Sequence, residues 1–396
     1  MKRNESFILK ELNGVPYLLP YGQAQLEFRR SCRLNKTGAF LWNLLEQEHS
    51  MEELAESCAD AFHVTAEELP ALRNDVRQFL EHLAERGCLS EGSTEDSGNS
   101  YPVRYLRIGS LVIRLEGVDE AFSEQFHPFY CDARDTVDQT IVVHPFSPFR
   151  HINGMLLLRS GGLTVIDAGG EYALLFPLKT HVEEAHLSKD ASRTYFYCHP
   201  PYTDAFREEL FHAIRFSFLY LAQKHHMAAL HSASFLYQGK AWLFSGPSGT
   251  GKSTHTNLWK EMLQVPLLNG DVNLLALKDG QPVIHGLPWC GTSGICDPGT
   301  YPLGGIILLK QSEGDWVETL SPDDQRLLVL QRLISPSWTS QMLDCNLNLV
   351  EALAPQIYIA RLHCTKEFSA VTAMKAGIDS YLTSNSKEKL SDCSKQ

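Results

Sequence analysis

The sequence contains no long apolar run, and its balance of charge is not basic. Nowhere do about 18 consecutive apolar residues occur, so no transmembrane helix is predicted. The N-terminal segment MKRNESFILKEL is charged and lacks the apolar stretch of a signal peptide. The formal net charge of −12 argues against a general nucleic-acid-binding protein, which would normally carry a basic face. We therefore expect a cytoplasmic protein with no nucleic-acid partner.

Paired cysteines and internal repeats are also missing. The ten cysteines are scattered, and none forms a Cys-x-x-Cys pair. This spacing lacks the usual zinc and dense-disulfide patterns and predicts reduced thiols. Hydrophobic residues make up 43% and charged residues 21% of the chain, as in ordinary globular proteins. Because 396 residues are many for one hydrophobic core, we predict two or three domains.

The clearest domain boundary is the segment SEGSTEDSGNS at residues 90–100, which has no apolar residue. Such a segment cannot bury itself and is typical of a flexible linker. The predicted division of the chain is an N-terminal domain at 1–90, a linker at 91–100, a β-rich subdomain at 101–200, a further domain at 201–384 and a frayed polar tail at 385–396.

Residues 1–90 carry the signals of three strands followed by three helices. The dipeptide Asn13-Gly14 between two apolar runs predicts a β-hairpin, and a third strand is expected over 25–32. Asn35 is a good helix N-cap, and the segments SMEE at 50–53 and TAEE at 65–68 are capping boxes. This order predicts a winged-helix arrangement.

The same segment resembles the PqqD-like family, the peptide-recognition element of ribosomal-peptide modification pathways. The resemblance spans roughly residues 5–90 and depends on LNKTGAFLWNLL at 34–45, on the acidic helix after Ser50, and on DVRQFL at 75–80. It implies that a leader peptide adds as an extra strand beside the third strand and contacts the last helix. Four arginines are candidates for meeting an acidic leader, or are ordinary solvated charges: Arg29, Arg30, Arg73 and Arg77.

Residues 101–200 have β-strand composition, with runs at 105–115, 155–159 and 163–167 and a hairpin expected at 159–163. No residue pattern there indicates chemistry, so we interpret the segment as a scaffold. Residues 205–227 form an apolar-striped helix that we expect to pack beneath the following domain.

The segment GPSGTGKS at residues 246–253 is a complete phosphate-binding loop. Its glycines let backbone N–H groups converge on phosphate oxygens, Lys252 supplies charge for the β- and γ-phosphates, and the Ser253 hydroxyl is a Mg²⁺ ligand. A strand at 241–245 and a helix from Thr254 flank the loop, as this motif requires. We predict an ATP and Mg²⁺ site formed by Gly246, Ser248, Gly249, Thr250, Gly251, Lys252, Ser253 and Thr254.

Two further residues are catalytic candidates. Asp271 ends an apolar strand after the loop helix, where a carboxylate can bind Mg²⁺ or accept the proton of an attacking hydroxyl. His231 lies just before the strand that precedes the loop strand, and is either a site residue or a satisfied half-buried histidine. A glycine-rich loop at 286–294 is expected to close over the γ-phosphate or bind the acceptor.

Residues 205–380 resemble HPr kinase/phosphorylase-type kinases, the P-loop branch related to ATP-dependent phosphoenolpyruvate carboxykinase. The resemblance depends on LHSA at 230–233, the phosphate loop, NGD at 269–271, PWCG at 288–291 and YIARLHCT at 358–365. It implies phosphate and Mg²⁺ binding by Lys252 and Ser253, the strand-end acid at Asp271, and an orienting role for His231.

The implied fold class is an α/β P-loop kinase domain of the HPr kinase type with a β-rich subdomain, plus an N-terminal α+β winged-helix PqqD-like domain. One position departs from the family, which usually carries two adjacent acids where this chain has Gly270 and Asp271. A single carboxylate must bind the metal or act as base, because a metal-bound acid is a poorer base. The assignment of a base therefore stays open.

The sequence thus predicts an ATP- and Mg²⁺-dependent kinase for a Ser or Thr hydroxyl of a ribosomally made precursor peptide held by the N-terminal domain. Three alternatives remain: a non-catalytic ATP-binding peptide chaperone, a small-molecule kinase or carboxykinase-like enzyme, and an ATP-gated DNA-binding regulator. The last is disfavoured because the N-terminal unit lacks a dense Lys/Arg helix. A homo-oligomer is compatible with all of these.

Overall fold

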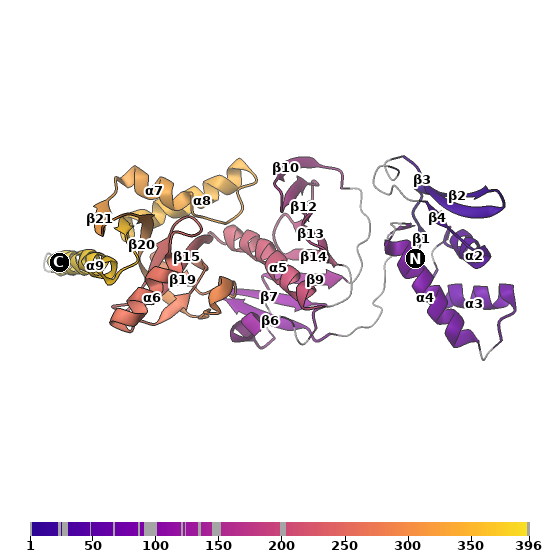
Figure 1. The fold of residues 1–396 in the computed structure, drawn as a ribbon, viewed down its shortest axis with the longest axis horizontal. Coiled ribbons are helices and arrows are strands. Elements are labelled where there is room, and N and C mark those ends of the chain that lie inside the picture. Colours follow the sequence, from indigo (N-terminus) through magenta and orange to yellow (C-terminus); the bar gives the residue numbers. More distant parts are fainter. Residues whose placement is uncertain are drawn as a thin grey trace.

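The structure is a computed structural model that describes residues 2–22, 25, 31–47, 49–65, 68–85, 88–90, 101–119, 122, 124–133, 136–144, 152–198 and 203–393. Within these residues the strands form sheets of two, three, eight and nine strands (Figure 1). No described helix combines the length and the apolar character needed to cross a membrane. The division of the chain into domains stays a prediction.

The N-terminal unit is a small α+β arrangement with its own core around the fully buried Trp42. Strands β2, β3 and β4 form an antiparallel sheet in that order, and β1 pairs with β5. Its elements are β1 (Lys2–Arg3), β2 (Phe7–Leu12), β3 (Val15–Pro20), β4 (Cys32–Arg33), α2 (Lys36–Leu44), α3 (Met51–Phe62), α4 (Leu69–Glu85) and β5 (Leu89–Ser90).

Local signals in this unit are confirmed where the structure describes them. Asn13 and Gly14 both have positive φ, at 51° and 77°, as a tight two-residue hairpin requires. The Asn35 side chain accepts from the Gly38 amide at 2.7 Å, and Ser50 and Glu53 form a reciprocal capping box. The expected third strand over 25–32 is found only at Cys32, where β4 begins, since Gln25 is helical rather than extended. Residues 26–30 lie outside the described part.

Strands of the next region form one nine-stranded sheet in the order β10-β11-β12-β13-β14-β9-β7-β6-β8. The β-rich expectation is confirmed, including the hairpin between β10 and β11. The run expected over 105–115 is interrupted, because Gly109 adopts a φ of 61° and turns the chain into two paired strands. The strands are β6 (Arg104–Ile108), β7 (Leu111–Glu116), β8 (Tyr130–Cys131), β9 (Gln139–His144), β10 (Met155–Arg159), β11 (Thr164–Asp167), β12 (Glu171–Leu175), β13 (Val182–Ser188) and β14 (Arg193–Cys198).

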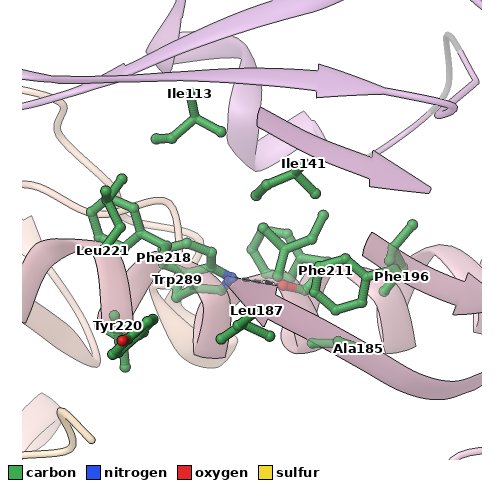
Figure 2. Packing of buried hydrophobic residues seen from close by; sticks show 14 of the residues in the cluster. Ile113, Ile141, Ala185, Leu187, Phe196, Phe211, Phe218, Tyr220, Leu221 and Trp289 are labelled. Carbon is green, nitrogen blue, oxygen red and sulfur yellow. Dashed lines mark hydrogen bonds between the residues drawn. The ribbon is translucent and has the colours of Figure 1, made fainter. Parts of the chain in front are cut away.

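Helix α5 (Asp204–Lys224) packs its aromatic stripe mainly against this sheet. Phe211 and Phe218 share one core with Ile141 and Leu187 of the sheet (Figure 2). The expectation that α5 lies only beneath the following domain is therefore incomplete. The same core includes Val272 and neighbouring residues of the next sheet, so the helix lies at the junction of the two sheets.

The remaining region is mixed α/β and contains a small five-stranded barrel. Strands β16, β15, β18, β19 and β20 pair in that order, and a parallel pairing of β16 with β20 closes the ring. Strand β22 extends it beside β20, also in parallel, and β21 lies at its edge. The strands are β15 (Ala228–Tyr237), β16 (Lys240–Ser245), β17 (Leu267–Asn269), β18 (Val272–Lys278), β19 (Gln281–His285), β20 (Thr300–Gln311), β21 (Trp316–Thr319) and β22 (Tyr358–Cys364).

Helices cover both faces of the parallel strands β16, β20 and β22. Residues of α6 (Lys252–Leu263) and α9 (Phe368–Cys393) share one core with these strands. Residues of α7 (Pro322–Leu330) and α8 (Ser340–Leu353) share another. Because β16, β20 and β22 run in parallel, their C-terminal ends meet at one edge of the sheet.

Candidate functional site

The glycine-rich loop at residues 246–251 connects β16 to α6, as the sequence predicts. Gly249 and Gly251 have φ values of 79° and 102°, which a side chain would oppose. Gly246 is held tightly, because an added Cβ would lie 2.6 Å from the Thr250 hydroxyl oxygen. Ser248 and Gly249 are exposed at the tip of the loop. The loop therefore presents its backbone directly before a helix N-terminus, where an anion is favoured.

Lys252 is the first residue of α6, and its side chain is buried. Its Nζ donates to the carbonyl oxygens of Gly246 at 3.3 Å and Pro247 at 3.4 Å. Burial lowers the pKa of Lys252, and the carboxylate of Asp271 opposes that shift. Ser253 follows at the exposed start of the helix, and Thr254 is half-buried beside it.

His231 on β15 contacts Asp271, with 3.2 Å between Nε2 and Oδ1. Asp271 lies in the turn between β17 and β18 rather than at the end of a strand. The hydrogen bond from His231 holds the pKa of Asp271 below its usual value. Both side chains are about one-third exposed. His231 lies inside β15 rather than before it, which corrects the expected position. The structure thus brings His231 and Asp271 together and places the charge of Lys252 close enough to act on Asp271.

A buried amide shapes the turn that carries Asp271. The Oδ1 atom of Asn269 accepts from the amides of Asp271 at 2.9 Å and Val272 at 3.0 Å. Its Nδ2 donates to the Leu287 carbonyl at 2.8 Å. Sequence reasoning used Asn269 only as part of a resemblance. In the structure the Asn269 side chain fixes the backbone of this turn and thereby positions Asp271.

Gly270 is enclosed by the loop that follows β19. A Cβ added there would lie 2.0 Å from the Ser293 hydroxyl oxygen and 3.0 Å from the Cys290 carbonyl oxygen. No acidic side chain fits at this position without rearranging the loop. The single carboxylate at this strand end is therefore tied to the local packing.

The loop at 286–294 is anchored rather than free to close along its whole length. Trp289 is buried between Phe211 and Phe218, and its Nε1 donates to the Phe211 carbonyl at 2.9 Å (Figure 2). Leu287 and Cys290 are buried as well. Only the segment at 291–294, which includes a short 3-10 turn, is exposed. The expectation of a closing loop is thus limited to these residues.

Two cavities flank the glycine-rich loop and share no lining residue. The first, here called the basic cavity, has a volume of about 290 Å³ and includes Lys310, Arg332 and Arg361. The second, the polar cavity, has a volume of about 230 Å³ and is rich in hydroxyls and amides. The latter is lined by Ser234, Ser253, Thr256, Asn257, Leu267, Asn269, Gly270, Thr292, Ser293 and Ile295.

The sequence analysis assigned no role to four cations near this site, of which only Arg361 belonged to a quoted motif: Arg215, Lys310, Arg332 and Arg361. The charge of Arg215, on α5, helps to lower the pKa of Asp271. The other three come from segments far from the loop in the chain. Parallel pairing with β16 brings Lys310 on β20 and Arg361 on β22 to the loop, and Arg332 reaches it from the segment after α7.

Comparison with known proteins identifies the N-terminal part. Residues 26–89 match the family described as coenzyme PQQ synthesis protein D (PqqD). These residues form a PqqD-like domain. The resemblance expected from the sequence is thereby confirmed for this segment.

This chain is also similar to a solved structure, TbiB1 in complex with the TbiA(beta) leader peptide, with 25% sequence identity. It covers 24% of this chain and all of that chain, with a TM-score of 0.20. The comparison with curated proteins gives no match.

The four candidate peptide-contacting arginines of the PqqD-like domain are only partly placed. Arg73 and Arg77 are exposed and four residues apart on α4. Arg29 and Arg30 lie outside the described residues. Strand β4 is an edge of the sheet β2-β3-β4, at the position where the sequence expects an added strand.

Proposed function

We propose that this protein is an ATP-dependent kinase that phosphorylates a Ser or Thr hydroxyl of a ribosomally made precursor peptide held by its PqqD-like domain. The observation that carries the proposal is the buried Lys252 at the start of α6, beside the His231–Asp271 pair. A strand, a glycine-rich loop and a helix in this order support a P-loop kinase fold of the HPr kinase type.

The residues of this site fit a nucleoside triphosphate. Lys252 is a buried cation that donates to two loop carbonyls, and no described carboxylate forms an ion pair with it. The start of α6 directs unpaired backbone amides toward the same place. The neighbouring polar cavity offers hydroxyl and amide groups to a nucleoside.

Mg²⁺ would be held by the Ser253 hydroxyl together with phosphate oxygens and water, and it would supply neutralisation of phosphate charge. The single carboxylate of the site, Asp271, is then left to act as the base. Among the described residues no group of three or more His, Cys, Asp or Glu side chains is placed to hold a metal. This sparse donor set suits Mg²⁺, which usually keeps waters and phosphate oxygens as ligands.

In the proposed reaction, a bond forms between the acceptor hydroxyl oxygen and the γ-phosphorus. The bond from this phosphorus to the β–γ bridging oxygen breaks, and its electron pair leaves with ADP. The hydroxyl proton passes to the carboxylate of Asp271, which His231 orients. A carboxylate with a lowered pKa is a weak base, and phosphoryl transfer depends more on positioning and charge stabilisation than on base strength.

The PqqD-like domain binds the leader of the precursor peptide by strand addition at the β4 edge. Backbone hydrogen bonds would supply affinity, and Arg73 and Arg77 on α4 would contribute charge toward an acidic leader. Holding the leader raises the effective concentration of the weakly bound hydroxyl to about millimolar for a short flexible tether.

A second candidate is a non-catalytic ATP-binding peptide chaperone. Gly270 favours it, because this enclosed position leaves the strand end with one carboxylate. Such a protein would bind ATP and peptide without transferring phosphate.

The deciding experiment incubates the full chain with the precursor peptides encoded beside its gene, ATP and Mg²⁺, and reads peptide mass. A gain of one phosphoryl group that disappears in Lys252→Ala and Asp271→Asn supports the kinase. Calorimetric heat with ATP–Mg²⁺ but no modified peptide supports the chaperone. Absence of heat with ATP–Mg²⁺ removes both functions.

A further inference from the structure

The basic cavity carries three cations and no acid among its lining residues, in a chain of net charge −12. Its walls are Ser245, Gly246, Pro247, Leu308, Leu309, Lys310, Leu328, Arg332 and Arg361. A pocket of this charge and of about 290 Å³ accommodates a small anionic group.

The cavity lies where the strand pairing directs a ligand. Ser245 ends β16, Lys310 is near the end of the parallel strand β20, and Arg361 belongs to β22. Clefts outside the carboxyl ends of parallel strands are common ligand sites in α/β folds. The residues at 245–247 also begin the glycine-rich loop, so the cavity adjoins the proposed phosphate site.

Among the described residues, two of the three cations have no acidic partner. Glu318 pairs with Arg361, at 2.9 and 3.1 Å from its Nη1. Within the described part of the chain, no carboxylate lies within ion-pair distance of Lys310 or Arg332. The apolar walls reduce screening by water, so an oxyanion between these cations is stabilised more than at an open surface.

Arg332 also connects the cavity to the strand that carries His231 and to Lys252. Its carbonyl accepts from the His231 amide at 3.1 Å, and Ser245 Oγ donates to the His231 carbonyl at 2.8 Å. The charge of Arg332 acts on Lys252, whose pKa it helps to lower. The cavity therefore adjoins the backbone of His231 and the site of Lys252, whereas the polar cavity is lined by Ser253.

We propose that the basic cavity binds an oxyanion of the acceptor peptide itself, a carboxylate or a phosphate, close to the hydroxyl that is phosphorylated. This inference rests on the kinase proposed above and adds its substrate class, a hydroxyl with a neighbouring anion. Arg332 and Lys310 hold the anion, and this contact fixes the hydroxyl beside Asp271. Restricting the hydroxyl in this way lowers the entropic part of the barrier.

The test compares Arg332→Gln with the control Arg326→Gln in the full chain. Arg326 is on α7, donates to the Pro322 carbonyl at 2.7 Å and does not line the cavity. With the phosphorylated precursor identified, Arg332→Gln should raise the peptide KM by roughly 10- to 100-fold, the value of a charge-assisted contact. ATP–Mg²⁺ affinity should be unchanged in both variants.

The source of the oxyanion is decided by changing the peptide. If the oxyanion is a carboxylate, replacing the acid nearest the modified hydroxyl by its amide should raise the peptide KM of wild type as much as Arg332→Gln does. The same replacement should raise the KM of Arg332→Gln no further. An increase in the peptide KM of wild type on removing a phosphate already present on the peptide would instead identify the oxyanion as a phosphate. Either coupling supports the proposal.

Three results overturn it. An unchanged peptide KM in Arg332→Gln excludes the contact. Weakened ATP affinity assigns the cavity to the nucleotide. If the wild-type protein shows no turnover, the proposed kinase activity is wrong. Calorimetric titration with inorganic phosphate then tests the anion site separately from the kinase activity. Arg332-dependent phosphate binding would leave an anion site without an acceptor role, and absence of binding would remove the site as well.

Discussion

Lys252 is a buried cation at the start of α6, directly after a loop of uncharged residues, and burial lowers its pKa. Its role is therefore expected to be electrostatic rather than structural. We predict that Lys252→Ala abolishes ATP-dependent turnover, leaves leader-peptide affinity unchanged and does not lower the free energy of unfolding appreciably. Lys260→Ala, at an exposed position of the same helix, is the matched control. Loss of peptide binding in Lys252→Ala would contradict the separation of the two sites.

Asp271 gives a pH dependence with a defined sign. Its pKa is lowered from 3.8, chiefly by the hydrogen bond from His231, so it stays ionised at neutral pH. The stability from this interaction is present above the unfolded-state pKa and is lost as the pH falls through the lower folded-state pKa. We predict that wild type and Asp271→Asn differ by about 1 kcal/mol or less, because the pair is partly exposed.

That difference should shrink below pH 3.8, as measured by denaturant unfolding at several pH values. Turnover should fall by about 10²- to 10⁴-fold in Asp271→Asn, the usual contribution of a general base. An acid limb of kcat near neutral pH that vanishes with Asp271→Asn would contradict the lowered pKa.

Gly270 makes a steric prediction. Because its Cβ would lie 2.0 Å from Ser293 Oγ, Gly270→Ala should lower the free energy of unfolding by about 1–3 kcal/mol. Combining it with Ser293→Gly should recover part of the loss, since the nearest two contact atoms are then removed. Denaturant melts of the two single variants and the double variant measure this coupling. Additive losses would show that the enclosure is not the cause.

Among the elements, the segment 286–290 connects β19 to the core of the other sheet. Trp289 is nearly fully buried against α5. We therefore expect it to fix the position of this segment and, through it, of the turn that holds Asp271. We predict that Trp289→Ala costs about 3–5 kcal/mol of unfolding free energy and lowers turnover. Trp289→Phe, which keeps most of the volume but loses the bond to the Phe211 carbonyl, should cost much less.

The measurement is chemical denaturation together with kcat. The exposed Trp316→Ala is the control for loss of an indole, since it is 49% exposed. Equal stability losses in Trp289→Ala and Trp316→Ala would argue against an anchoring role.

For the whole molecule, the proposal divides binding and chemistry between the PqqD-like domain and the region around α6. A leaderless peptide should therefore be phosphorylated by the full chain with a KM about two orders of magnitude higher and a similar kcat. Adding the leader as a separate peptide should not restore KM, because the tether is then lost. Restoration would point to allosteric activation rather than to effective concentration.

Features encoded by neighbouring residues were predictable. The hairpin at Asn13-Gly14, the caps at Asn35 and Ser50 and the glycine-rich loop before Lys252 each depend on contacts within a few positions. Interruption at Gly109 was missed because an apolar run looks the same whether or not one glycine turns it.

Contacts between distant segments were not predictable. Neither the closure of β16 on β20 nor the cavity that gathers Lys310, Arg332 and Arg361 follows from any local pattern. The physical reason is that such positions are chosen by strand pairing and by packing over long sequence separations. Local sequence patterns thus predict the glycine-rich loop and the peptide-binding family. The surroundings of Asp271 and Gly270 are set only by tertiary contacts between distant segments, which form when the chain folds.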